Sequence, residues 1–376
     1  MVAQGKNPVQ VLRLEDTIHD GVAPFEYNIE KGIGDFLLPN QFHFDTFKLN
    51  QFLTDVCIYY GIRIEEHKIT DVVLEEAGWD HSEEKIKYIR TDNVQEIRAD
   101  LFVDCTGFAK TLISKFSDYE WKDLSHEFLT NRAITWQTET DFSKIIAFTK
   151  ATALDHGWVW TIPTQTHIGY GYVFSDNHVS LDRAVEEVEE KFQVSDIGRD
   201  IKFDSGYCTK AWIGNTVAIG LSSSFCEPIE ATNIATIIQQ ARILTNHLST
   251  IDNDYSFQLK SYNKIFGGMM DNLFDFVRLH YYGNKNDSQF WVDNQNIKMN
   301  DRISFLHECC TKGGTPDKAL IETGGTAILE NVYNLFTQKN YLLNLYAIGW
   351  WGKSNAVELL KDIHFEINKI TESKID

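Results

Sequence analysis

Long apolar runs are absent from this sequence: no stretch of about 18 apolar residues occurs, and the first residues lack the apolar core of a signal peptide. The six cysteines form no CxxC pair, so neither a zinc ribbon nor a disulfide framework is indicated. Positive charge is scarce, with 35 Lys and Arg against 54 Asp and Glu and a net charge of −19. We therefore expect no nucleic-acid or membrane partner, and a soluble, cytoplasmic protein with reduced thiols.

The composition is otherwise that of a large globular protein, with 376 residues of which 43% are hydrophobic and 13% aromatic. Apolar spacing predicts a helix over 44–61, one from Ser180, one near Thr232 and mostly helix beyond Asp252. Strand patterns cover 62–74, 85–90, 96–107, 133–138, 157–163, 168–174 and 216–221, and those at 101–103 and 217–219 are expected to be buried. Glu186, Glu187, Glu189 and Glu190 predict a solvated helix face. The order indicates an α+β/α/β fold with mixed sheets and a helical C-terminal part.

The segment from Gly220 to Ile234 is the most informative taken alone, because a strand ends, a loop carries two carboxylates and a helix begins. Free N–H groups at a helix start can hold a small anion or a cofactor oxygen, and Thr232 and Asn233 occupy that start. Glu230 would stand beside such an anion. The alternative is that Glu227 and Glu230 favour the helix start electrostatically and that Thr232 caps it.

Two tryptophans alternate in Trp158-Val-Trp-Thr-Ile-Pro. Because side chains alternate along a strand, both indoles lie on one face and form an apolar wall. Ordinary core packing is the alternative explanation of the hexapeptide.

This hexapeptide fits the WxWxIP motif, and the chain resembles the flavin-dependent halogenases of the tryptophan halogenase family. Five further segments resemble that family in the same order: Phe42-His-Phe-Asp-Thr-Phe-Lys; Ala99-Asp-Leu-Phe-Val-Asp-Cys-Thr-Gly-Phe; Gly169-Tyr-Gly-Tyr-Val-Phe-Ser; Gly220-Leu-Ser with Glu227-Pro-Ile-Glu; and Asp275-Phe-Val-Arg-Leu-His-Tyr-Tyr with Gln289-Phe-Trp. The resemblance implies a FAD-dependent oxidoreductase-like fold. Its expected parts are a partial FAD-binding domain with a meander (1–118), a substrate-side sheet (119–200), a return to the FAD-binding domain (201–245) and a helical halogenation subdomain (246–376).

The resemblance also implies a chemistry, in which reduced FAD, O2 and a halide ion yield hypohalous acid that halogenates an electron-rich aromatic substrate. A flavin reductase would supply the reduced FAD as a diffusible partner. Carried over position by position, the implied residues are Glu230 as the catalytic glutamate; Trp158 and Trp160 as the flavin-side wall; Leu221 and Ile234 at FAD; Thr232 and Asn233 at the halide; and Tyr281, Tyr282, Phe290 and Trp291 at the substrate.

Several family features have no counterpart here. No GxGxxG occurs, so the N-terminal βαβ unit is expected to be missing, and with it the family's lysine, for which Lys31 is a poor match. The family's Ser and Gly are Ala231 and Asn233 here, and we expect position 233 to be one where Gly would permit positive φ. Unpaired apolar strand edges would then favour association with a complementing N-terminal polypeptide or a second copy.

Two other readings stay open at this stage: a flavin monooxygenase on the same scaffold, and a non-catalytic remnant or partner-binding module. No metal site is expected, because His307-Glu308-Cys309-Cys310 lacks an established ligand spacing and is better explained as the end of a helix.

Overall fold

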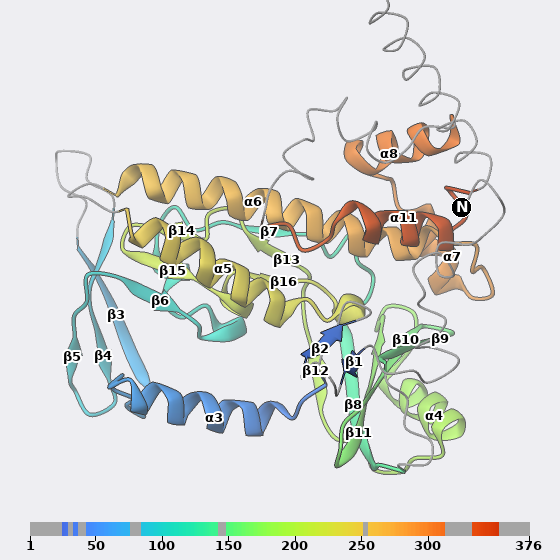
Figure 1. The fold of residues 1–376 in the computed structure, drawn as a ribbon, viewed down its shortest axis with the longest axis horizontal. Helices are drawn as coiled ribbons and strands as arrows, with labels where there is room; N and C mark the ends of the chain where they lie inside the picture. Colours follow the sequence, from blue (N-terminus) through green and yellow to red (C-terminus); the bar gives the residue numbers. More distant parts are fainter. Residues whose placement is uncertain are drawn as a thin grey trace, which may run out of the picture. The chain divides into compact units, whose positions relative to one another are not determined.

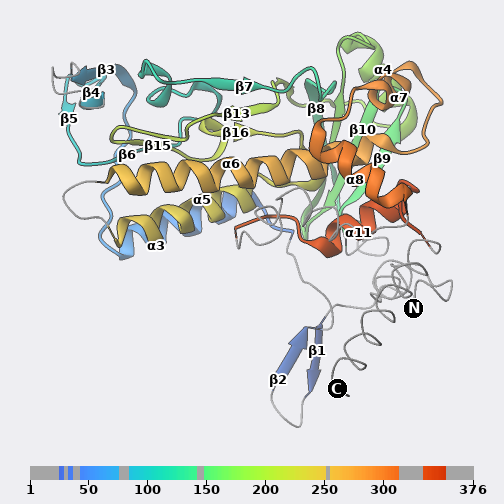
Figure 2. The same cartoon turned by 90° about the horizontal axis from the view of Figure 1, so that it is seen from above.

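A computed structural model describes residues 43–75, 84–141, 148–250, 255–312 and 333–352, together with the backbone of 25–28 and 33–36 (Figures 1 and 2). The expected missing N-terminal unit and Lys31 lie outside these residues. The chain divides into two compact units: unit 1 comprises Met1–His43, Leu129–Lys202 and Phe274–Asp376, and unit 2 comprises Phe44–Phe128 and Phe203–Leu273. This division does not test the functional domains expected from the sequence, which stay a prediction.

Unit 1 is built on a five-stranded antiparallel sheet in the order β12-β8-β11-β10-β9. Its strands are β8 (Arg132–Glu139), β9 (Lys150–Leu154), β10 (Gly157–Pro163), β11 (His167–Phe174) and β12 (Asp200–Lys202). Helix α4 (Leu181–Phe192) covers one face, burying Ala184 and Val188 against Val159 and Tyr172 (Figure 1). Further helices among the described residues of unit 1 are α7 (Gln289–Asn296), α8 (Asp301–Thr311) and α11 (Gln338–Ala347); η6 spans His280–Tyr282, and β1 (Phe25–Asn28) pairs with β2 (Ile33–Phe36).

Unit 2 contains three small sheets among its described residues. They are β3-β4-β5 (Ile69–Glu75, Lys85–Thr91, Glu96–Ile97), β14-β15-β6 (Trp212–Ile213, Thr216–Ala218, Phe102–Asp104) and β16-β13-β7 (Ser224–Phe225, Gly206–Cys208, Trp121–Asp123). Strands β15 and β6 pair in parallel. Short 3₁₀ turns are η2 (Gly107–Ala109), η3 (Ile113–Lys115), η4 (Gly220–Ser222) and η5 (Pro228–Glu230).

The described residues of unit 2 include α3 (Thr46–Tyr59), α5 (Asn233–Leu248) and the first part of α6 (Ser256–Leu279), whose last residues belong to unit 1. Helices α5 and α6 lie side by side in both views (Figures 1 and 2). The His247 ring of α5 packs edge-on against the Tyr262 ring of α6. Among the described residues, even the 24-residue α6 is not apolar enough to cross a membrane.

Most of the predicted elements are confirmed, including the stop at Gly61, which takes a φ of +74° after α3, and the start of α4, where Ser180 accepts a hydrogen bond from the Arg183 N–H. Two predictions are wrong in part. Residues 62–68 are not in a strand. Val103 was expected to be buried but is 44% exposed. Side chains alternate between the two faces of a strand, so when Phe102 faces the core, Val103 faces the other side.

The predicted solvated face of glutamates also needs a correction, at Glu187. Its carboxylate accepts hydrogen bonds from the Tyr172 hydroxyl (2.8 Å) and the Asp155 N–H (3.1 Å), and it lies 3.2 Å from His156 Nδ1. Glu187 is one turn from buried Ala184, so it borders the buried face of α4 rather than the solvated one. Burial and the Glu187 charge raise the pKa of Tyr172, which therefore stays protonated as the donor.

Candidate functional site

The predicted anion site lies in unit 2, where η5 leads into α5. Thr232 is the N-cap residue but its side chain makes no capping hydrogen bond; its carbonyl instead accepts from the N–H and hydroxyl of Thr236 (2.9 and 3.1 Å). The capping role considered for Thr232 is therefore wrong. Glu230 is half-buried three residues before the first helical residue, and Glu227 is fully buried.

The strained backbone position in this loop is not the expected one. Ala231 has a φ of +49°, whereas Asn233 begins the helix and has no positive φ. The expectation that position 233 requires a glycine-like conformation is wrong, because the left-handed residue is the one that ends η5. A non-glycine residue with positive φ costs on the order of 1 kcal/mol, so the loop is held in place by its surroundings.

The preceding turn η4 is hydrogen-bonded to Asp104, which the sequence analysis did not single out. It is fully buried at the end of β6, and its carboxylate accepts from the Leu112 N–H (2.9 Å), the Ile113 N–H (2.8 Å) and the Ser222 hydroxyl (3.2 Å). Buried Gln240 of α5 accepts from the Gly220 N–H at 3.2 Å. An acidic residue at the end of a strand, in Asp-Cys-Thr-Gly, was the available signal.

The two positions expected at FAD lie on either side of this loop. Leu221 is half-buried in η4, and Ile234 is 43% exposed in the first turn of α5. Gly107 and Gly220 follow the parallel strands β6 and β15 with φ near +70°, and a Cβ on Gly107 would meet no atom within 4 Å. Ligands of open α/β sheets bind at the carboxyl ends of parallel strands, so this edge fits a flat cofactor approaching the backbone.

The predicted tryptophan wall lies in unit 1 on the central part of β10. Trp158 is 2% exposed, Trp160 is half-buried and lies over Gly171, and Val159 between them faces the α4 core. The prediction that both indoles share one face is confirmed. Trp158 Nε1 donates to the Tyr281 hydroxyl at 3.1 Å, so the structure brings together two of the predicted site residues.

The four predicted substrate residues are all buried, between 0% and 7% exposed. Tyr281 stacks on Trp291 with ring centroids 5.8 Å apart, and Phe290 meets both rings edge-on. The Arg278 guanidinium lies 4.6 Å from the Tyr282 ring. These side chains form a packed aromatic cluster in unit 1 that includes Trp158.

A serine, histidine and aspartate also line up in unit 1. His178 contacts the Ser175 hydroxyl through Nδ1 (2.8 Å) and Asp293 through Nε2 (3.0 Å). Ser175 is 0% exposed, so its hydroxyl cannot reach a substrate, and the three residues serve to tie α7 to the sheet. The hydrogen bonds from His178 and Gln289 lower the pKa of Asp293.

None of the described cysteines whose pKa is shifted has an activated thiol. Burial raises the pKa of Cys208 and of Cys310 to about 12, and the pKa of Cys226 rises well above its ordinary value. Thiols with raised pKa values are inert. His307–Cys310 indeed lie at the end of α8, and no group of three or more His, Cys, Asp or Glu in the described part of the chain is arranged to hold a metal ion.

Comparison with known proteins gives a consistent result. The family model described as tryptophan halogenase matches residues 31–359. The chain is 30% identical over 302 residues to the 7-chloro-L-tryptophan 6-halogenase of Kutzneria sp. (strain 744). This match covers 78% of this chain and 57% of that protein. It is 31% identical over 265 residues to the tryptophan 7-halogenase of Lentzea aerocolonigenes, covering 64% of this chain and 49% of that protein.

Solved structures agree with the sequence matches. The tryptophan 6-halogenase of Streptomyces toxytricini superposes with a TM-score of 0.73 at 27% identity, covering 88% of this chain and 63% of that one. The flavin-dependent halogenase of Brevundimonas sp. BAL3 gives 0.71 at 25% identity, covering 88% and 66%. The chain spans about half the length of the curated relatives it matches.

Proposed function

Since this chain belongs to the tryptophan halogenase family, we propose that it takes part in halogenating an electron-rich aromatic substrate. Reduced FAD and O2, when bound, would supply the oxidant that converts a halide ion to hypohalous acid. The family match favours this function over the monooxygenase and remnant alternatives. The four functional domains expected from the sequence and a cytoplasmic location, where thiols stay reduced, remain parts of the proposal.

The observation that carries the proposal is the start of α5. The Thr232 side chain makes no capping hydrogen bond, and we propose that the N–H groups of Thr232 and Asn233 hold a halide ion at the positive end of the helix dipole. A halide needs such donors and no strong negative field against it. We infer that Glu230 serves the substrate side, where its carboxylate can hold or accept a proton during attack by the aromatic ring.

Flavin binding is supported by the carboxyl ends of β6 and β15. A Cβ at Gly107 would meet no atom within 4 Å, so the backbone is open there, and Leu221 and Ile234 offer apolar contacts nearby. Trp158 and Trp160 would wall the flavin side, with Trp158 oriented by its hydrogen bond to Tyr281. The proposed substrate residues Tyr281, Tyr282, Phe290 and Trp291 are themselves buried, so we propose that they shape the aromatic substrate site by packing behind it.

A further polypeptide is part of the proposal, either a complementing one with a GxGxxG unit or a second copy of the chain. Helix α3 has no buried residue, and it exposes Phe47 (77%), Phe52 (61%) and Tyr59 (82%). Exposed apolar area on this scale marks an interaction surface. Val103 on the edge strand β6 is a second exposed apolar position in unit 2.

Two experiments test these proposals. The first is gel filtration of the purified chain with FAD, alone and with a GxGxxG-bearing polypeptide, while light scattering reports its mass. Flavin that co-elutes in neither case would contradict the cofactor proposal, and Phe47→Glu should weaken association if α3 is the interface.

The second is product analysis by mass spectrometry with FAD, a flavin reductase, a halide salt and a panel of indoles and phenols. We expect Glu230→Gln to abolish halogenation, whereas Glu189→Gln, on the exposed face of α4, should leave it unchanged. Full activity of the Glu230→Gln protein would show that Glu230 has another role.

A further inference from the structure

We propose that Arg278 is a positioning residue of the aromatic cluster in unit 1. Its charge fixes the rings of Tyr281 and Tyr282 and, through Tyr281, the indole of Trp158. The contacts that carry this inference all lie within unit 1, and the inference rests on the proposed function only for what Trp158 does in halogenation.

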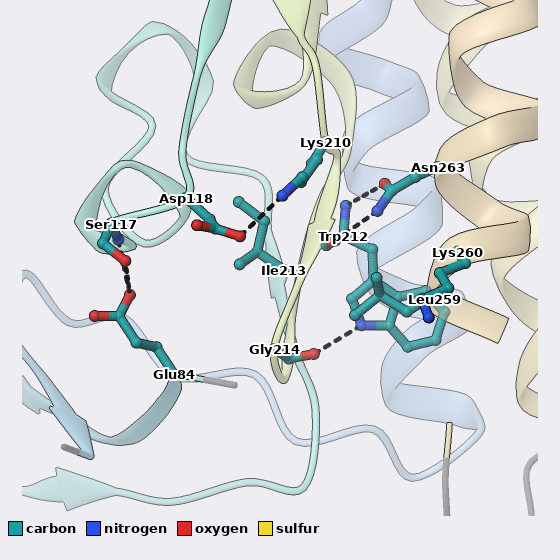
Figure 3. A pocket seen from close by; sticks show the side chains of 10 residues that line it. All are labelled: Glu84, Ser117, Asp118, Lys210, Trp212, Ile213, Gly214, Leu259, Lys260 and Asn263. Carbon is teal, nitrogen blue, oxygen red and sulfur yellow. Dashed lines mark hydrogen bonds and ion pairs between the residues drawn. The ribbon is translucent and has the colours of Figure 1, made fainter. Parts of the chain in front are cut away.

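Arg278 is among the largest fully buried side chains of the described residues, with 1% of its surface exposed. Several other described cations pair with a carboxylate, such as Lys210 with Asp118 at 2.8 Å where both line a cavity of about 480 Å³ in unit 2 (Figure 3). Arg278 makes no ion pair with any residue that the structure describes. Asp275, one turn earlier on α6, pairs instead with Arg302 at 3.0 Å.

Two tyrosine rings and the end of α7 hold the Arg278 guanidinium instead. Its central carbon lies 5.4 Å from the centroid of the Tyr281 ring and 4.6 Å from that of the Tyr282 ring. Nη1 donates to the side-chain oxygen of Asn294 (3.0 Å), and Nη2 donates to the Asn294 carbonyl in the last turn of α7. Ring faces and helix C-termini both carry partial negative charge, so these contacts take the place of a counter-ion.

A cation in this place is costly, because burial removes its hydration and its Nε has no hydrogen-bond acceptor among the described residues. An apolar side chain of similar length, such as methionine, would fill the space without burying a charge. The guanidinium is planar and donates in fixed directions, so it joins the two rings and the helix end in one geometry. Arg278 therefore serves the position of its neighbours.

Tyr281 passes this constraint on to Trp158. The Tyr281 hydroxyl accepts from Trp158 Nε1 at 3.1 Å, and the Tyr281 ring also stacks on Trp291. The orientation of the ring sets where its hydroxyl lies. In the proposed function Trp158 walls the flavin side, so a displaced Tyr281 would disturb that wall.

The indole N–H signal of Trp158 in heteronuclear NMR, identified by its loss in Trp158→Phe, tests this inference without flavin, halide or substrate. Lysine and methionine match in length, so a difference between Arg278→Lys and Arg278→Met reports the charge. We expect the Trp158 N–H to exchange with solvent about tenfold faster in Arg278→Met, and at an intermediate rate in Arg278→Lys. Arg183→Met, at an exposed arginine of α4, is the matched control and should leave the signal unchanged.

Tyr281→Phe removes the accepting hydroxyl but keeps the ring, and should speed the exchange of the Trp158 N–H as much as Arg278→Met does. An unchanged signal in Arg278→Met, or equal exchange in Arg278→Met and Arg278→Lys, would overturn the proposal.

The same variants separate this inference from the proposed function. Once halogenation is measured, Arg278→Met should lower kcat by about tenfold and Arg278→Lys by less, and equal kcat values would overturn a role of the charge in the reaction. If the unsubstituted protein halogenates nothing while the Trp158 signal responds as expected, the proposed function fails and the positioning role of Arg278 stands.

Discussion

In unit 1 the aromatic side chains of α7 and η6 are buried against one another and against Trp158, whereas in unit 2 the aromatic side chains of α3 point into solvent. Phe290 is 0% exposed and Phe47 is 77% exposed, although each is a phenylalanine in the first turn of a helix. Residue type and helical position are thus the same, and only the presence of a packing partner differs. An aromatic helix with such a partner is part of a core, and α3, which has none among the described residues, is where we propose that a further polypeptide binds.

The difference between the two helices is tested most strongly by truncating both phenylalanines. Phe290→Ala should lower the free energy of unfolding by about 3–5 kcal/mol, because it leaves a cavity, while Phe47→Ala should change it by less than about 0.5 kcal/mol. Urea unfolding followed by fluorescence measures both. Equal effects would mean that α3 is packed in solution as firmly as α7.

Substituting Asp104 tests whether the stability of unit 2, like that of unit 1, depends on specific buried contacts. Asp104→Leu should cost about 3 kcal/mol, because the Leu112 and Ile113 N–H groups lose their acceptor in a buried place. Asp100→Leu, an exposed acid four residues earlier, is the control. A cost below about 1 kcal/mol would show that backbone or water replaces the carboxylate.

Removing a helix cap should affect stability differently in the two units, with a smaller effect than the substitutions above. Ser180→Ala removes the α4 cap and should cost about 1 kcal/mol of global stability, because α4 buries Ala184 and Val188. Asp45→Ala removes the α3 cap, where Asp45 accepts from the Phe47 N–H at 2.9 Å. Since α3 buries no residue, we expect faster hydrogen exchange within α3 alone and little change in global unfolding.

The smallest expected effect is a pH dependence in each unit. Asp176 has its pKa lowered by hydrogen bonds from Asn131 and Lys202, and Asp123 has its pKa lowered by those from Ser125. A lowered folded-state pKa contributes stability above the unfolded pKa of about 4, and this is lost as pH falls through the folded pKa.

In the Asp176→Asn protein, the stability of unit 1 should therefore fall less steeply as the pH is lowered. Asp123→Asn should have the same effect on the stability of unit 2. Thermal unfolding measured at a series of acidic pH values, with tryptophan fluorescence and hydrogen exchange assigning each unit, checks this. If neither substitution changes how stability depends on acidic pH, other carboxylates dominate acid unfolding.

Much of the candidate site was accessible from local pattern. The strand at 157–163 and the start of α5 were predicted from alternation and from a Gly-loop-helix order, and both are confirmed. Asp104 was missed because one acidic residue after a strand is common, and its role depends on N–H groups eight and nine residues later.

The sequence alone determined where most of the helices and strands lie and that the two tryptophans of β10 share one face, because these follow from periods of 3.6 and 2 within a few residues. Only the tertiary structure decided that Trp158 bonds Tyr281, 123 positions away, that Glu187 turns inward, and that Ala231 rather than Asn233 takes a positive φ. Each of these depends on which surfaces meet. That is set by packing between distant segments, which no local period encodes.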